Sequence, residues 1–156
     1  MTSPPVTDRE YAYFRATGAF SPDDVTRLLG LDPSESWSVG EDFATPNGHA
    51  LKRRSSSWKL SSGLDDTEAL DTHVGSLLRQ LRPRRDGLLK ASSIAKLQIV
   101  CVGYYFQNFS WELCLDHQQL ASALNVGFWF DTYSLNDHHE EMVALREQLG
   151  LRTKLE

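Results

Sequence analysis

Arginine and tryptophan side chains that could hold a ligand lie close together in the middle of the chain. Arg54 precedes Trp58 by four residues, so the two side chains share one face if residues 50–61 form a regular strand. A guanidinium group beside an indole ring can bind an anionic or planar ligand. We group these two residues with Arg53 and Tyr104 as one candidate pocket, although the arginines could instead pair with acidic residues of the same molecule.

A second set of candidate binding residues alternates near the end of the chain. Trp129, Asp131 and Tyr133 share one face of an expected strand, whereas Phe128 and Phe130 point to the opposite face. The phenylalanines are expected in the core. Tyrosine and tryptophan are common at binding surfaces, so the first face is a candidate partner-binding face.

Two interpretations of Asp131 stay open at this stage. The carboxylate could contact a basic partner, or it could anchor an arginine such as Arg54 inside the molecule. Trp37 lies in a segment, residues 32–50, that is rich in Ser, Pro, Gly and Asn and is expected to be a long surface loop. Its indole could close over the same face.

Signatures of catalysis and of metal binding are weak. The run Asp137-His138-His139-Glu140-Glu141 contains potential metal ligands, but adjacent side chains on a helix point in different directions. We expect its acids to lie at a helix N-terminus, where they favour the helix dipole. No HExxH or GxSxG spacing occurs. We therefore assign no metal site, no cofactor and no catalytic residue.

The two cysteines also suggest no chemistry. Cys101 and Cys114 form no CxxC pair, and we identify no histidine near either of them in the sequence. Both lie in apolar runs and are expected to be buried free thiols.

The composition limits the class of protein. The 156 residues suit one domain, and the formal charge is −5. By thirds, residues 1–50 carry −5, residues 51–110 carry +5 and residues 111–156 carry −5. An acidic chain argues against nucleic-acid binding. The lack of a long apolar run and of an export signal predicts a cytoplasmic protein that does not span a membrane.

The expected elements make an α+β domain in which helices cover a mainly antiparallel sheet. We expect a flexible leader at 1–8, one domain at 9–150 and a tail at 151–156. Ser21, Pro22 and Gly30 indicate the start and the end of a first helix. The remaining expected elements are strands at 10–17, 50–61, 95–106, 110–115 and 127–134 and helices at 70–81, at 84–92, from Asp116 and from Asp137.

One internal similarity suggests two related halves. A shift of 95 residues places Ser21 on Asp116 and Gly30 on Asn125, with the apolar stripe of the first helix on that of the later one. The domain is then two pseudo-repeated strand–helix–strand halves, or the match is that of two ordinary capped helices.

Several motifs in order resemble a known family. These are Tyr13-Phe14-Arg15, Phe20-Ser21-Pro22-Asp23, Leu28-Leu29-Gly30-Leu31, Pro33, Trp37 and Gly40, then Arg54, Trp58, Leu60-Ser61-Ser62-Gly63, Cys101-Val102-Gly103-Tyr104 and Phe130-Asp131-Thr132-Tyr133. The pattern is similar to the bacterial domain-of-unknown-function family 4279 over about residues 9–135. The resemblance implies a shared fold and no mechanism.

The sequence therefore favours a non-enzymatic binding module. One form of it is an immunity-like inhibitor of a basic toxin, in which acidic side chains steer association. Its acidic candidates are Asp23, Asp24, Glu41, Asp42, Asp131, Glu140 and Glu141. The alternative is a domain that binds a small anionic ligand through the arginine–tryptophan pocket, and an unrecognised hydrolase is third.

Overall fold

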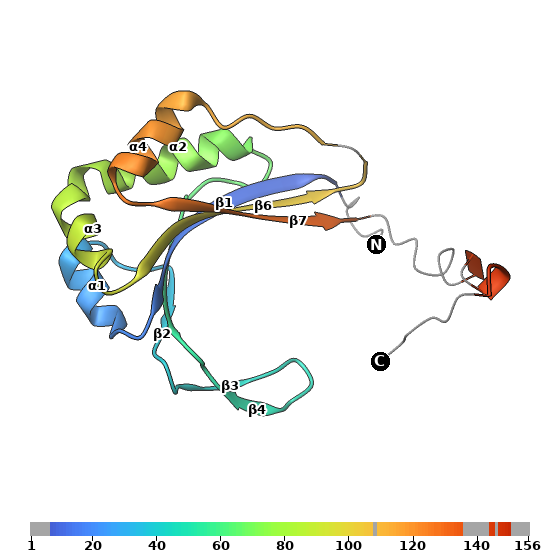
Figure 1. Ribbon diagram of the computed structural model, residues 1–156, viewed down its shortest axis with the longest axis horizontal. Helices are drawn as coiled ribbons and strands as arrows, with labels where there is room; N and C mark the ends of the chain where they lie inside the picture. Colours follow the sequence, from blue (N-terminus) through green and yellow to red (C-terminus); the bar gives the residue numbers. More distant parts are fainter. Residues whose placement is uncertain (1–6, 108, 136–143, 146, 151–156) are drawn as a thin grey trace, which may run out of the picture.

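The computed structural model of the chain describes residues 7–107, 109–135, 144–145 and 147–150. Its main element is a five-stranded sheet in which the strands lie in the order β2-β5-β1-β6-β7. The four labelled helices lie on one side of this sheet (Figure 1). The strands are β1 Arg9–Gly18, β2 Glu35–Trp37, β5 Ser56–Ser61, β6 Lys96–Tyr105 and β7 Gly127–Ser134, and a separate hairpin is formed by β3 Asp42–Ala44 and β4 Ala50–Lys52.

The first helix begins and ends where local signals place it. The helices are α1 Pro22–Leu29, α2 Leu70–Leu81, α3 Arg85–Ala91 and α4 Leu115–Ala123, with a 3₁₀ turn η1 at Arg82–Arg84. As predicted, α1 begins after Ser21 with Pro22 at its first position and ends at Gly30, whose left-handed φ of 62° favours glycine. Pro83 follows α2 and lies in the 3₁₀ turn.

The pairing of the strands confirms an α+β fold with a mostly antiparallel sheet. β2 with β5, β5 with β1, and β1 with β6 pair antiparallel, whereas β6 and β7 pair parallel. A parallel pair needs a crossover connection, and α4 provides it.

The core lies between the sheet and the helices. Phe14, Trp58 and Ile99 come from β1, β5 and β6, and Leu77 and Leu78 come from α2; all five side chains are fully buried. Phe14 and Trp58 meet edge to face, with ring centroids 6.0 Å apart. Every second residue of the central strands therefore points to the helix side.

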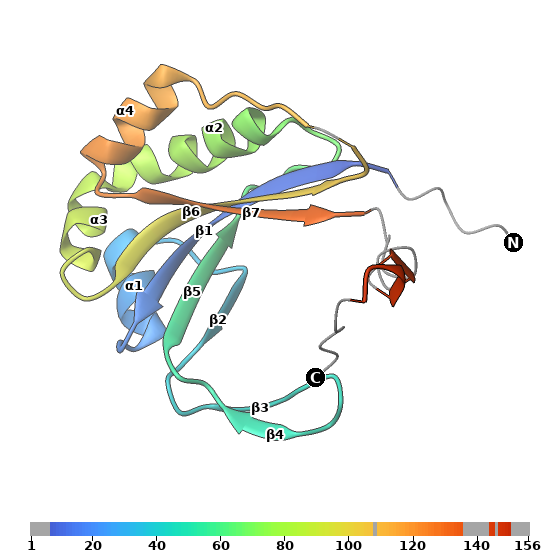
Figure 2. The same ribbon diagram turned by 45° about the vertical axis from the view of Figure 1, so that its right-hand side comes forward.

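The prediction of one strand at 50–61 is wrong, and so is that of a loop throughout 32–50. The segment before Arg53 is β4, which pairs with β3 in a hairpin that projects from the sheet (Figure 2). The strand resumes at Ser56, whose buried hydroxyl donates a hydrogen bond of 2.5 Å to the carbonyl of Phe20. This contact fixes the start of β5 against the end of β1.

The predicted hairpin from 95–106 into 110–115 is also wrong. Residues 110–114 form no strand, and α4 begins at Leu115 after an extended Cys114 rather than at a capping Asp116. The backbone N–H of Cys114 donates to the carboxylate of Asp71 in α2 at 3.1 Å. The segment thus passes over the helix layer instead of pairing with β6.

The two helices related by the internal similarity share their ends but not their surroundings. Asn125 after α4 has a left-handed φ of 58°, close to the 62° of Gly30 after α1. The strands flanking α1 are β1 and β2, which both pair with β5 and not with each other, while β6 and β7, which flank α4, pair directly and parallel. The shared ends are those expected of two helices terminated by a left-handed residue.

Part of the expected chain organisation falls on residues that the structure does not describe. These are residues 1–6 of the leader, the tail at 151–156 and the start of the last helix, including His138, His139, Glu140 and Glu141. Ala144, Leu145, Glu147 and Gln148 are helical. Among the described residues, no helix has the length and apolar character needed to cross a membrane.

Candidate functional site

The side of the sheet opposite the helices carries aromatic and cationic side chains. We call it the open face. The register shows why these residues gather there: Arg15 of β1 lies opposite Lys59 of β5 and Gln98 of β6, and Val100 of β6 lies opposite Trp129 of β7. Its main members are Arg9, Tyr11, Tyr13, Arg15, Trp37, Lys59, Tyr104, Trp129, Asp131 and Tyr133.

Cations on the open face lie over aromatic rings. The guanidinium carbon of Arg15 is 5.6 Å from the ring centroid of Trp129. The ammonium of Lys59 is 5.3 Å from the Tyr13 ring and 4.8 Å from the Trp37 ring. Such contacts hold a long side chain in place while its hydrogen-bond donors stay available.

The β6–β7 side of the face repeats this arrangement. Tyr104 and Tyr133 stack with ring centroids 4.9 Å apart, and the guanidinium carbon of Arg9 is 4.2 Å from the Tyr104 ring. The Tyr133 hydroxyl donates to Asp131 at 2.8 Å, and this hydrogen bond raises the pKa of Tyr133 above its ordinary value. Asp131 therefore has a tyrosine partner rather than the arginine that one interpretation required.

Arg15 is the central cation of the open face. Its Nε and Nη2 both donate to Gln98 Oε1, at 3.2 and 2.9 Å. Among the described residues, no carboxylate lies within ion-pair distance of Arg15, whereas Lys59 pairs with Glu35 at 3.1 Å. Its charge is thus held in place without being neutralised.

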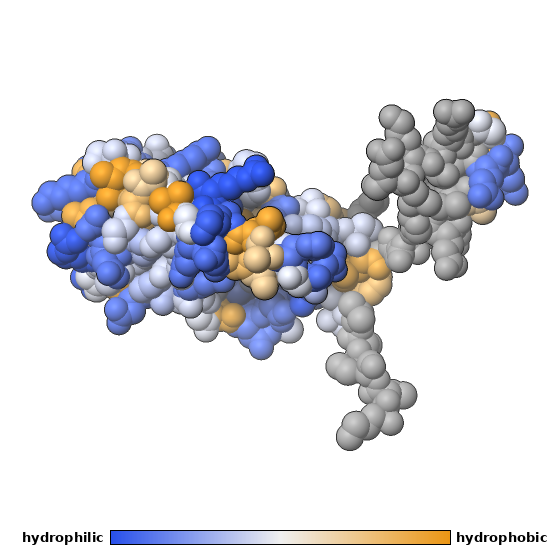
Figure 3. Space-filling view, turned by 90° about the horizontal axis from the view of Figure 1, so that it is seen from below, coloured by the Kyte–Doolittle hydropathy of each residue, from blue (hydrophilic) through white to orange (hydrophobic). Residues whose placement is uncertain are grey.

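The open face is shallow. A hollow of about 470 Å³ lies over Tyr11, Tyr13 and Lys59 and is open to solvent. A second one, of about 460 Å³, lies at the ends of β6 and β7, outside the open face itself, where Tyr105 and Ser134 of the helix side line it together with Tyr133. Seen from below, the side away from α2 and α4, small hydrophobic areas alternate with hydrophilic ones (Figure 3). The surface thus suits a partner that lies across it.

The predicted pocket of Arg54 and Trp58 is wrong. Trp58 is fully buried on the helix side, where its indole N–H donates to the Thr26 hydroxyl at 2.9 Å. Arg54 is exposed in the bend before β5 and shares no face with Trp58. Arg53 instead stacks on Trp37, with its guanidinium carbon 4.0 Å from the ring centroid.

The prediction for β7 holds for one face and only partly for the other. Trp129, Asp131 and Tyr133 lie together on the open face, as their alternation indicates. Phe128 packs against the core, but Phe130 is 45% exposed and stacks on Trp111. β7 is the edge strand, so the helices cover it incompletely.

Trp37 does not close over Trp129. It belongs to β2 at the opposite edge of the sheet, and its indole N–H donates to the carbonyl of Ser55 at 3.1 Å. The strands between the two edges keep these tryptophans apart.

The acidic residues expected to contact a basic toxin are spread over different elements. Asp24 pairs with Arg27 on α1, and Asp42 pairs with Lys52 in the β3–β4 hairpin. Glu41 accepts the backbone N–H of Ser38 at 3.0 Å. These described acids make local contacts and form no single acidic surface with Asp131 on β7.

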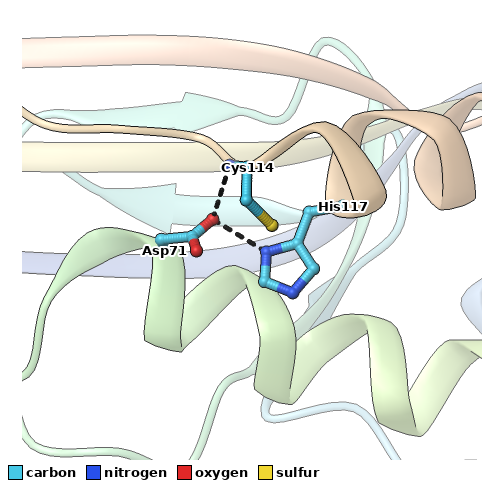
Figure 4. A group of neighbouring side chains, drawn as sticks. All are labelled: Asp71, Cys114 and His117. Carbon is cyan, nitrogen blue, oxygen red and sulfur yellow. Dashed lines mark hydrogen bonds and ion pairs between the residues drawn. The ribbon is translucent and has the colours of Figure 1, made fainter.

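A second group of reactive side chains lies between α2 and α4, where no site was predicted. Asp71, Cys114 and His117 place one carboxylate oxygen, the sulfur and one ring nitrogen within 4.8 Å of one another (Figure 4). His117 Nδ1 and Asp71 Oδ1 are 2.7 Å apart. Burial acts to raise the pKa of Asp71, but hydrogen bonds from His117 and from the backbone of Cys114 bring it below its ordinary value.

A glycine allows the two helices to meet at this group. A Cβ atom at Gly75 of α2 would lie 3.1 Å from Cε1 and 3.2 Å from Nε2 of His117. The imidazole ring thus lies directly on the backbone of α2. The sequence did contain one signal for the group, because Cys114 and His117 are only three residues apart, Cys114 directly before α4 and His117 in its first turn. The statement that neither cysteine has a nearby histidine is wrong.

The two cysteines differ in environment, which predicts different reactivity. Cys101 is 2% exposed, and burial raises the pKa of its thiol to about 12, whereas Cys114 is half-buried and is not in a strand. Because the thiolate is the reactive form, we expect iodoacetamide at pH 8 to modify Cys114 but not Cys101 in the folded protein. Mass spectrometry should show one alkylated cysteine when native, two in denaturant and none in native Cys114→Ser. Modification of Cys101 at the native rate of Cys114 would contradict this assignment.

Comparison with known proteins identifies a family without an assigned activity. The family described as "Domain of unknown function (DUF4279)" matches residues 8–135. No curated protein and no solved structure matches the chain.

Proposed function

The chain belongs to the DUF4279 family, whose matched region contains the whole five-stranded sheet, and we propose that this member is a binding module whose open face docks acidic side chains of a protein partner. The observation that carries the proposal is Arg15. Its guanidinium group is oriented by Gln98 and Trp129 and has no neutralising carboxylate among the described residues. A partner carboxylate would supply one, in a charge-assisted hydrogen bond.

The shape of the face supports a protein rather than a small molecule. Small ligands are usually bound in concave pockets that bury most of their surface, whereas the hollow over Tyr13 is open. Exposed tyrosine, tryptophan and arginine are the residues enriched in protein interfaces. Trp129 and Tyr133 are 49% and 45% exposed on this face.

The contacts that the aromatic rings of the open face already make support a carboxylate, rather than a nucleic-acid strand, as the partner group. Single strands are bound by stacking bases on free aromatic faces. Here Trp129, Trp37 and Tyr13 each have a cation near the ring, and Tyr104 stacks on Tyr133.

Calorimetric titration with defined probes tests the proposal. The probes are a short peptide of alternating glutamate and leucine, the same peptide with lysine for glutamate, and a single-stranded oligothymidylate. We expect the glutamate peptide to bind best. Because a hydrogen bond to a charged group contributes about 1.5–3 kcal/mol, Arg15→Gln should weaken this binding by about tenfold or more.

Matched variants separate the open face from general electrostatics. Arg27→Gln removes the same charge from α1, on the helix side, and should leave the affinity unchanged; Trp129→Ala should weaken binding while keeping Arg15. Tighter binding of the lysine peptide or of the oligonucleotide would overturn the proposal. Equal affinities of wild type and Arg15→Gln would do so as well.

A further inference from the structure

The group formed by Asp71, Cys114 and His117 lies in the helix layer, away from the open face. All three side chains are half-buried, so they are held by α2 and α4 and still reached by solvent. Neither the core nor the open face uses them. We propose that these three residues bind a zinc ion or a similar divalent transition metal.

The spacing of the donor atoms supports this assignment. Zinc binds carboxylate oxygen and imidazole nitrogen at about 2.0–2.2 Å and thiolate sulfur at about 2.3 Å, which brings its ligand atoms to within about 4 Å of one another. The oxygen, nitrogen and sulfur atoms already lie within 4.8 Å. Small side-chain rotations therefore suffice to enclose an ion.

The chemistry of the donors selects the kind of metal. One thiolate, one imidazole and one carboxylate suit zinc, cobalt or nickel, whereas magnesium and calcium prefer oxygen alone. Asp71 and a Cys114 thiolate together balance the two positive charges of the ion. This neutrality matters because Arg79 lines the same hollow of about 370 Å³. Water can take the remaining coordination position.

The geometry favours metal binding over a cysteine nucleophile. In a nucleophilic triad the imidazole holds the carboxylate with one ring nitrogen and takes the proton of the nucleophile with the other. In Figure 4 the sulfur of Cys114 and the carboxylate of Asp71 lie on the same Nδ1 side of the His117 ring, and Nε2 points away from both. Three donors that converge on one point are what an ion requires.

Titration of the full chain with Co²⁺ and Zn²⁺ tests the proposal. Cobalt should produce a thiolate-to-cobalt charge-transfer band, and zinc should displace it and raise the melting temperature. Loss of a residue that only supports a metal ligand commonly lowers metal affinity by about 10–100-fold. Cys114→Ser and His117→Gln remove the ligands themselves, so each should lower the zinc affinity by at least about 100-fold. Mg²⁺ should have no effect.

Controls distinguish this site from other histidines and from a simple ion pair. The double variant His138→Gln/His139→Gln and the exposed-histidine variant His49→Gln should bind zinc as the wild type does. Gly75→Ala keeps all three ligands but displaces the His117 ring, and should weaken binding. Absence of a charge-transfer band in the folded wild-type protein, or its persistence in Cys114→Ser, would overturn the proposal and leave a hydrogen-bonded Asp71–His117 pair.

Discussion

Replacing Gly87 with alanine is expected to lower the free energy of unfolding by about 3 kcal/mol, the upper end of the usual range for overpacking. A Cβ atom at Gly87 would lie 2.0 Å from the carbonyl oxygen of Leu28 and 2.9 Å from its carbonyl carbon. Both atoms belong to the backbone of α1, so no side-chain rotation relieves the contact. The helices α1 and α3 must move apart, and this disturbs the packing of Leu29 of α1 and Leu88 of α3, which are both buried in the core.

Urea denaturation monitored by circular dichroism measures this effect. Gly75→Ala is the matched control, because Gly75 also lies within a helix. A Cβ atom at residue 75 would contact only the side chain of His117, which can shift, rather than a backbone. Alanine is favoured over glycine in a helix by about 1 kcal/mol, so the control should change stability little or raise it. A Gly87→Ala protein that unfolds at the urea concentration of the wild type would show that α1 and α3 do not pack as described.

The sequence predicted those elements whose signals are local. Ser21, Pro22 and Gly30 alone indicate where α1 begins and ends. The alternation of Trp129, Asp131 and Tyr133 predicts that these three side chains share one face, whichever strand pairs with them. Features that depend on neighbours in space were missed. The parallel pairing of β6 and β7 follows from a segment that crosses the helix layer, and nothing within residues 107–114 indicates that path.

The candidate sites likewise depend on contacts between residues that are distant in the sequence. Arg15, rather than Arg54, lies beside Trp129, because the registers of β1, β6 and β7 bring them together across more than 100 residues of sequence. Cys114 and His117 were detectable as neighbours at the start of a helix, but Asp71 joins them only through the packing of α2 on α4. Local spacing thus identified the residue types, whereas the strand register at one site and the packing of two helices at the other decided which of them meet.

Trp58 shows how a residue typical of binding surfaces can instead be part of the core. Its polar N–H group has a partner in Thr26, and its ring packs on Phe14, so the indole is satisfied inside the protein. Arg53, five residues before Trp58 in the sequence, contacts the ring of Trp37 and not that of Trp58. The break between β4 and β5 separates the arginine cluster from the buried part of the strand.

Replacement of Trp58 with alanine should therefore act on stability rather than on recognition. Removal of a fully buried tryptophan leaves a cavity, and the expected loss is about 3–5 kcal/mol of the free energy of unfolding. Trp58→Phe keeps most of the packing but loses the hydrogen bond to Thr26, so a loss of about 1–2 kcal/mol is expected. Chemical denaturation of both variants measures these differences.

Trp129→Ala is the matched comparison for Trp58→Ala, because the two tryptophans lie on opposite faces of the same sheet. Trp129 is 49% exposed and Trp58 fully buried, so Trp129→Ala should change the unfolding free energy by less than about 1 kcal/mol and weaken binding of the glutamate peptide. The two variants should thus separate stability from binding. If Trp58→Ala instead unfolded like the wild type and only lost ligand binding, Trp58 would belong to a ligand pocket beside Arg54, and the assignment of recognition to the open face would be wrong.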